Sequence, residues 1–159
     1  MTFDPRAFRD ALGRFATGIA VATTRDGEGA PVGVTVNSVT SVSLEPPLVL
    51  FCLDRAANTL PAFEAAPGFA LNILEEGQQD LSIRFSLFHA PDRWDGVARE
   101  AWETGSPILE GCLASLECVR HAVYDGGDHV ILVGRVVRLV AREDGRPLLY
   151  WRGAYGRIG

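Results

Sequence analysis

The sequence contains no lysine, and its fifteen basic residues are all arginines. Twenty acidic residues outnumber them, so the formal net charge at pH 7 is -5. A chain of this charge lacks the diffuse basic surface that binds a phosphate backbone, and no nucleic-acid partner is expected. Because arginine presents a rigid fork of donors, any anion contact should be directional and confined to one site. Such a contact suits a small phosphorylated ligand.

Cysteine and histidine are also scarce. The three cysteines, Cys52, Cys112 and Cys118, form no Cys-x-x-Cys pair and lie in apolar surroundings. These features argue against a disulfide framework or a zinc knuckle, so we expect reduced, buried thiols. The three histidines lie far apart along the chain, and no metal site is expected.

Several sequence signals of location and chemistry are missing. No run approaches the roughly 18 apolar residues of a membrane span, and the first residues lack the basic and apolar regions of a secretory signal. We therefore expect a cytoplasmic protein that does not enter a membrane. There is no Gly-x-Ser-x-Gly, His-Glu-x-x-His or Gly-x-x-x-x-Gly-Lys motif, which argues against the serine hydrolase, zinc protease and phosphate-loop classes.

Apolar residues, in contrast, are plentiful. They make up 47% of the 159 residues, against 22% charged residues, which is enough for a substantial core. This length is typical of one domain, so residues 1–159 are predicted to form a single domain. The apolar share is high for a chain with a wet surface, and we expect a homodimer that covers one face.

The hydrophobic pattern predicts many short strands and few helices. Asp4 can cap an opening helix and Pro5 can start it, and apolar spacing extends this helix to near Gly18. Two more helices are expected over 59–66 and 78–85. Strands are expected over 19–24, 32–36, 48–52, 69–74, 113–124, 130–140 and 148–151, of which 48–52 should be buried on both sides.

The order of these elements predicts the fold class. Strands and helices do not alternate regularly, which favours a small antiparallel barrel over a doubly wound sheet. A turn signal at 125–128 predicts a hairpin between the two longest strands. Residues 86–107 have little periodicity and are expected to form a long excursion over the surface.

Hydroxyl and amide side chains crowd the end of the strand within residues 33–47 (GVTVNSVTSVSLEPP). In one interpretation they satisfy local backbone groups in a Ser/Thr-rich turn. In the other they form a ligand-binding edge that offers both donors and acceptors. Composition alone leaves both interpretations open.

Several segments, taken in order, resemble one known family. They are residues 8–24 (FRDALGRFATGIAVATT), the 33–47 block, Asn72-Ile73-Leu74 with 79–82 (QDLS), Gly127-Asp128-His129, and 147–150 (PLLY) with Gly153 and Tyr155. Over nearly the whole chain, their order and spacing resemble the flavin reductases that supply reduced flavin to two-component monooxygenases. The resemblance implies a mainly β fold, a split β-barrel of the FMN-binding type with antiparallel Greek-key strands and flanking helices.

The resemblance also implies the residues that hold the flavin. The Thr35, Val36, Asn37 and Ser38 segment should run along the isoalloxazine ring, whose pyrimidine edge needs both donors and acceptors. The ribityl-phosphate should be held by residues in two further segments: Ser41, Val42 and Ser43, and Asp54 through Thr59. Candidates for binding the phosphate itself are Arg55, Arg84 and the helix start at Asn58 and Thr59, with surface solvation as the alternative for both arginines.

Two residues are expected near the reductant. The resemblance places His129 at the mouth of the barrel beside the nicotinamide, while its alternative role is to stabilise the hairpin through Asp128. Tyr155 is placed near the flavin or nicotinamide, and could equally anchor the C-terminus against a partner subunit.

The implied activity is that of an NAD(P)H:flavin oxidoreductase, in which hydride passes from NADH or NADPH to FMN or FAD. The reduced flavin then leaves for a partner monooxygenase. Stacking the two rings needs no nucleophile, which agrees with the missing catalytic motifs. The alternative function is a non-catalytic module that binds flavin or haem.

Overall fold

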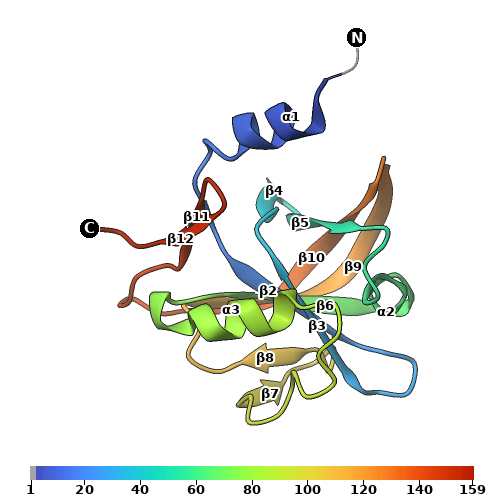
Figure 1. Ribbon diagram of the computed structural model, residues 1–159. Coiled ribbons are helices and arrows are strands. Elements are labelled where there is room, and N and C mark those ends of the chain that lie inside the picture. Colours follow the sequence, from blue (N-terminus) through green and yellow to red (C-terminus); the bar gives the residue numbers. More distant parts are fainter. Residues whose placement is uncertain (1–2) are drawn as a thin grey trace.

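The computed structural model describes residues 3–159 and consists mainly of antiparallel strands (Figure 1). In chain order the elements are α1 (Pro5–Leu12), β1 (Thr17–Gly18), β2 (Ala20–Arg25), β3 (Pro31–Val36), β4 (Thr40–Leu44), β5 (Pro47–Asp54), α2 (Leu60–Ala65), β6 (Gly68–Ile73), a 3-10 turn (Glu76–Gln78), α3 (Gln79–Ser86), β7 (Arg99–Ala101), β8 (Pro107–Leu109), β9 (Ala114–Gly126), β10 (His129–Ala141), β11 (Leu149–Trp151) and β12 (Ala154–Gly156).

One large sheet forms the body of the protein. Its seven strands follow the order β3-β2-β6-β9-β10-β5-β4, and every neighbouring pair is antiparallel. The two long strands β9 and β10 form the predicted hairpin, which the turn at Gly127 closes with a positive φ of 80°. Strands β3 and β4 are the two ends of the sheet, so each has a free edge.

The main core lies inside the curve of this sheet. Phe51 of β5 contacts Phe63 of α2 and Phe69 of β6 edge to face, with ring centroids 5.5 and 5.1 Å apart. All three rings are buried and pack with the valines and leucines of the inner strand faces. Aromatic pairs of this geometry add to the stabilisation from apolar burial. Helix α2 thereby closes one side of the barrel.

A second apolar cluster joins α3 to the outer face of β2 and β3. It contains Ile19, Val21 and Phe85, and Trp94 packs against it. A Cβ on Gly33 would lie 2.7 Å from the Phe85 ring, so only glycine allows this helix to lie so close to β3. This contact fixes α3 beside the strand that leads into the polar block.

A buried amide ties the strands together behind that block. The Asn72 side chain donates to the Val21 carbonyl at 3.1 Å and accepts from the Leu109 N–H at 2.9 Å and the Ser115 hydroxyl at 3.0 Å. Asn72 is fully buried, and these partners satisfy both its donor and acceptor ends. The network therefore locks β2, β8 and β9 to β6.

The structure corrects three of the predicted elements. The opening helix ends at Leu12 and not near Gly18, because Gly13 caps it through the Arg9 carbonyl and Thr17 then pairs with β11. The 48–52 strand is fully buried on one face only, since alternate residues are half-buried. The 86–107 excursion contains β7 and leads into β8, which together form a two-stranded ribbon.

Helix α1 buries none of its own residues and stands away from the sheet (Figure 1). Its apolar side chains Phe8 and Leu12 are 57% and 59% exposed, and the following Phe15 is 78% exposed. Across residues 3–159 no helix is long and apolar enough to cross a membrane. An apolar helix face of this kind needs a covering surface.

All three cysteines are free thiols. Cys112 and Cys118 are buried as expected, and burial raises their pKa values to about 11 and about 12. Cys52 is only half-buried, because it lies on the less covered face of β5. The two buried thiols therefore stay protonated and unreactive near neutral pH.

Candidate functional site

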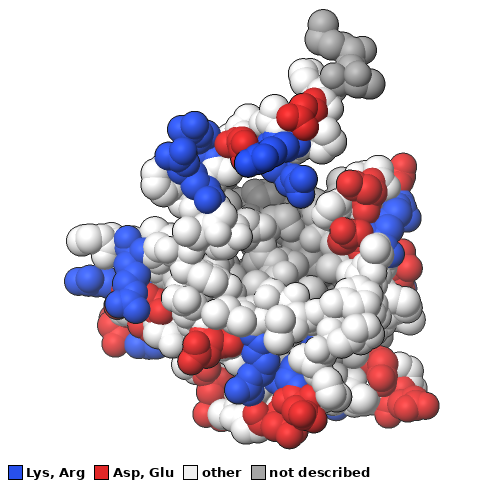
Figure 2. All heavy atoms as spheres, in the orientation of Figure 1, with Lys and Arg blue, Asp and Glu red and all other residues white. Residues whose placement is uncertain are grey.

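Three adjoining cavities meet at Asn37, the residue that follows β3. Their volumes are about 870, 560 and 230 Å³, and Asn37 lines each of them. The largest lies beneath α1, where Figure 2 shows a hollow between that helix and the body of the protein. The second is lined by residues 15–20 and 37–40, and the smallest by Thr35, Val36 and Tyr155. Of the predicted ring-binding segment, Asn37 therefore lines all three, Thr35 and Val36 line the smallest, and Ser38 lines the second.

The backbone of β3 offers unpaired polar groups along this hollow. Because β3 ends the sheet, alternate residues direct their N–H and C=O groups away from β2. The Gly33 carbonyl points outward, since it accepts from Arg93 Nη1 at 3.2 Å. The same alternation turns the backbone groups of Thr35 and Asn37 outward. This edge can supply both donors and acceptors to a planar heterocycle.

Side-chain hydrogen bonds connect β3 to the C-terminal segment. Thr35 donates its hydroxyl to the Ser82 carbonyl at 2.7 Å, and the Ser82 hydroxyl lies 3.0 Å from the Tyr155 hydroxyl. The Tyr150 and Tyr155 rings meet edge to face at 5.6 Å. The structure therefore brings Tyr155 to Thr35, and Ser82 is the link between them.

Ser38 holds the segment after β3 against β5. Its hydroxyl accepts from the Cys52 N–H at 2.9 Å and donates to the Cys52 carbonyl at 3.1 Å. The Ser38 hydroxyl thus replaces the backbone C=O and N–H groups with which a paired strand residue would bind Cys52. Asn37, in contrast, is exposed, and its side chain makes no hydrogen bond within residues 3–159. Ser38 therefore positions the segment, and Asn37 is free to contact a ligand.

The β9–β10 hairpin carries His129 next to a carboxylate. His129 Nδ1 lies 2.7 Å from Asp128 Oδ1, and this hydrogen bond, together with the charge of His129, lowers the pKa of Asp128. The contact orients the imidazole and leaves Nε2 for another partner. The alternative contact predicted for His129, with Asp128, is therefore present.

Arg55, the residue after β5, binds the same hairpin. Arg55 donates through Nε to the Gly127 carbonyl at 2.7 Å and pairs with Asp125. Its backbone N–H donates to the Asp128 carbonyl at 3.0 Å. The guanidinium is thus engaged in holding the turn, which is a different use from the phosphate contact expected for Arg55.

The strand register relates this hairpin to the polar block. Cys52, which bonds to Ser38, lies opposite Ile131 of β10, while Asp54 lies opposite His129. His129 is therefore two strands across and two residues along from Ser38. With strands about 4.8 Å apart and a rise of about 3.3 Å per residue, a tricyclic ring system can span this separation.

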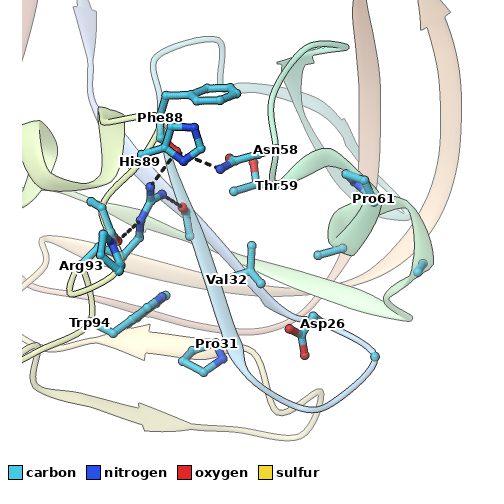
Figure 3. Close-up of a pocket in the computed structure, with 16 residues that line it drawn as sticks. Asp26, Pro31, Val32, Asn58, Thr59, Pro61, Phe88, His89, Arg93 and Trp94 are labelled. Atoms are coloured by element: carbon cyan, nitrogen blue, oxygen red, sulfur yellow. Dashed lines mark hydrogen bonds between the residues drawn. The ribbon is translucent and has the colours of Figure 1, made fainter.

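Asn58 and Thr59 line a fourth cavity of about 760 Å³, shown in Figure 3. It lies between the β2–β3 turn, α2 and the segment after α3. Asn58 donates to the Phe88 carbonyl at 2.8 Å. Arg93 closes the far side by donating to the carbonyls of Gly33, Leu87, Phe88 and Ala90. The cationic side chain on this cavity is Arg93, which the sequence reasoning missed.

The remaining predicted residues lie apart from these cavities. Ser41, Val42 and Ser43 belong to the edge strand β4, and Ser41 and Val42 are exposed. Arg84 is exposed in the last turn of α3 and donates to the Asp95 carbonyl at 2.9 Å. No sequence pattern identified Arg93 as a candidate, because Arg93 lies in the 86–107 stretch, which has little periodicity. Ser82 belongs to a segment that the sequence had singled out, although without a role.

Comparisons with known proteins show the family of the chain. Residues 12–159 match the model of the flavin reductase like domain. The reductase subunit HsaB of a flavin-dependent monooxygenase from Mycobacterium tuberculosis is 46% identical over 157 residues, covering 98% of this chain and 83% of that protein. The FMN reductase (NADH) SmoA of Agrobacterium fabrum is 45% identical over 153 residues, covering 96% and 86% of the two chains.

Solved structures give the same result. The Streptomyces globisporus NADH:FAD oxidoreductase SgcE6, in complex with NAD and FAD fragments, superposes with a TM-score of 0.91 at 36% identity, covering 100% of this chain and 97% of that one. The flavin reductase PheA2 superposes with a TM-score of 0.89 at 35% identity, covering 99% of each chain. These matches confirm the expected mainly β split-barrel fold. The chain belongs to the flavin reductase-like domain family.

Proposed function

We propose that this chain is an NADH:flavin oxidoreductase that supplies reduced flavin to a separate monooxygenase component. The observation that carries the proposal is the unpaired edge of β3, which ends at Asn37 where three cavities meet. Relatives over 40% identical across almost the whole chain bear this activity in their names. The function follows from the site and the family together.

The β3 edge suits the pyrimidine side of a flavin ring. That side has an N–H donor between two carbonyl acceptors, and the outward backbone groups of Thr35 and Asn37 match this alternation. The Asn37 amide adds a donor and an acceptor that are otherwise unused. Ser38 holds the edge in place from behind through Cys52.

The chemistry of hydride transfer, from nicotinamide C4 to flavin N5, belongs to the two bound molecules. The chain contributes orientation, and no side chain needs to act as a nucleophile. His129, oriented by Asp128 at the hairpin, is assigned to the nicotinamide side. Tyr155 is held by Ser82 and closes the opposite side of the smallest cavity.

The phosphate end of the flavin is assigned to Asn58 and Thr59. They line the cavity next along β3, and Arg93 on its far side forms no ion pair with a carboxylate within residues 3–159. A cation without a paired anion favours a phosphate. Arg55 and Arg84 are given structural roles instead, because neither lines this cavity: Arg55 is paired with Asp125 at the β9–β10 turn, and Arg84 donates to the Asp95 carbonyl.

The test is consumption of NADH and NADPH in air by the pure protein, with and without added FMN, FAD or riboflavin. We expect little oxidation without flavin and a rate that saturates as flavin is added, because the reduced flavin leaves and reacts with oxygen. The preferred pair of substrates emerges from the same assay. Flavin that stays bound through purification, without NADH oxidation, would instead favour a binding module.

We further propose that the protein works as a homodimer in which a second copy covers the apolar face of α1. Phe8, Leu12 and Phe15 are all more than half exposed, although large apolar side chains at helical spacing are normally covered. The helix overhangs the hollow at Asn37, so a partner seated on α1 would also border that hollow (Figure 2).

Replacement of Phe8 and Leu12 together by glutamate is expected to convert the dimer to a monomer. Neither side chain is buried within the chain, so the fold itself should survive the change. Light scattering after size-exclusion chromatography measures the mass, and the matched control is Arg6→Glu with Asp10→Arg on the polar side. A double variant that keeps the wild-type mass would contradict the α1 interface.

The setting proposed for this activity is the cytoplasm, where NADH is available. The three free thiols agree with a reducing compartment.

A further inference from the structure

The smallest of the three cavities at Asn37 is lined mostly by polar side chains. Of its eight lining residues, five carry a hydroxyl group and one an amide: Thr35, Ser82, Ser86, Tyr150, Tyr155 and Asn37. Its volume of about 230 Å³ is below the roughly 300 to 1,000 Å³ of a complete small-molecule site. Asn37 also lines the two larger cavities beside it. The small cavity therefore suits one polar edge of a larger ring whose remainder lies next door.

Hydrogen bonds within the chain decide which of these groups can donate into the cavity. The Thr35 hydroxyl donates to the Ser82 carbonyl, and the Ser86 hydroxyl donates to the Ile83 carbonyl, each at 2.7 Å. A hydroxyl has a single proton, so these two groups can only accept from a ligand. The Tyr150 hydroxyl makes no hydrogen bond within residues 3–159, so its proton is free.

The direction of the bond between Ser82 and Tyr155 follows from burial. Ser82 is fully buried, and its hydroxyl has one partner in the described structure, the Tyr155 hydroxyl 3.0 Å away. If Tyr155 donated, the Ser82 proton would be buried without an acceptor, which is costly. Ser82 therefore donates to Tyr155, and the Tyr155 proton remains for a ligand. The Tyr150 ring, edge to face at 5.6 Å, holds the Tyr155 ring from the other side.

A wall of O–H donors suits the charge that hydride transfer creates. The transfer breaks the C4–H bond of the nicotinamide and forms the N5–H bond of the flavin, so the nicotinamide is oxidised and the flavin gains two electrons. No proton enters in this step, so the reduced ring carries one negative charge, which is spread over N1 and the C2 carbonyl on its pyrimidine side. Hydrogen bonds to a charged acceptor are about twice as strong as those to a neutral one.

We propose that Tyr155 is a catalytic residue whose hydroxyl donates a hydrogen bond to the N1 and C2 carbonyl end of the flavin, with Tyr150 as a second donor and Ser82 as the positioning residue. The inference rests on the proposed function, which assigns the pyrimidine side of the ring to Thr35 and Asn37. Both tyrosines line the same cavity as these two residues. Because the bond strengthens as charge develops, it favours the transition state and the reduced flavin over the oxidised flavin.

Titrations of the full-length protein with FMN, oxidised in air or reduced by dithionite without oxygen, test this proposal. The Tyr155→Phe variant keeps the ring that packs on Tyr150 and loses only the hydroxyl. We expect its Kd for reduced FMN to rise about tenfold and its Kd for oxidised FMN to stay within about twofold. A tenfold difference makes the two-electron potential of bound FMN about 30 mV more negative. The matched control Tyr124→Phe removes an exposed hydroxyl on β9 and should leave both Kd values unchanged.

The Ser82→Ala variant tests the positioning role. It leaves the Tyr155 hydroxyl without its partner, so the Kd for reduced FMN should again rise more than the Kd for oxidised FMN, by a smaller factor. Because both changes act through one hydroxyl, the double variant should resemble Tyr155→Phe and not add the two effects.

Equal weakening of oxidised and reduced FMN by Tyr155→Phe would overturn the proposal, because a merely structural hydroxyl does not distinguish the two states. Unchanged values of both constants would overturn it as well. If Tyr155→Phe does not fold, Tyr150→Phe gives the same comparison at the second donor. Wild-type protein that oxidises no NADH with any flavin would refute the proposed function instead.

Discussion

Replacement of His129 by alanine is expected to raise the KM for NADH by about thirtyfold while the affinity for flavin changes little. A hydrogen bond between an oriented imidazole and the reductant is worth about 2 kcal/mol, which corresponds to that factor. His129 is fixed by Asp128 at 2.7 Å, and Arg55 holds the turn that carries both residues. The flavin contacts proposed here lie on β3, so they do not depend on the imidazole.

Steady-state kinetics with NADH varied at saturating flavin, and with flavin varied at saturating NADH, separate the two constants. His121→Ala is a matched control, because His121 is an exposed histidine on β9 outside the proposed site. Asp128→Asn keeps a hydrogen-bond partner for the ring and should give a smaller rise in KM. A larger change in the flavin constant than in the NADH constant for His129→Ala would exclude the nicotinamide role.

Most of the fold could be predicted because its signals are local. The alternation of Val32, Val34 and Val36, and the Gly-Gly turn before His129, specify strands and a hairpin without reference to the rest of the chain. The elements predicted wrongly are those whose structure depends on pairing with residues far away in the sequence. Thr17 and Gly18 continue a helical pattern in the sequence, yet they become a strand because Tyr150 and Leu149 pair with them.

The site residues show the same contrast between local sequence signals and contacts that depend on distant parts of the chain. Thr35 through Ser38 could be located from their crowding after a strand, and the structure places them on shared cavities. Long polar side chains were not predictable, because several competing partners lie within their reach. Arg55 and Arg84 were candidates for the phosphate, and each donates to a backbone carbonyl in the structure, a contact that the sequence did not predict. Arg93 lines the cavity only because a loop without periodicity folds back onto β3.

Joint replacement of Asn37 and Ser38 by alanine is expected to lower flavin affinity roughly a hundredfold. The two residues contribute in different ways, since Asn37 offers an unused amide to the ring and Ser38 holds the strand edge against Cys52. Each lost contribution is worth about 1 to 1.5 kcal/mol, and together they give about that factor. Titration of the apoprotein with FMN and FAD measures the change directly.

The single variants separate these two contributions. Asn37 is exposed and unbonded within the described residues, so Asn37→Ala should weaken flavin binding without changing the thermal midpoint. Ser38→Ala removes both hydrogen bonds to Cys52, so it should weaken binding and also lower the midpoint by a few degrees, about 1 kcal/mol of stability. Unchanged flavin affinity in the double variant would remove the β3 edge from the flavin site. A midpoint lowered equally by both single variants would instead assign Asn37 a structural role, because a purely ligand-facing amide contributes nothing to the free energy of unfolding of the apoprotein.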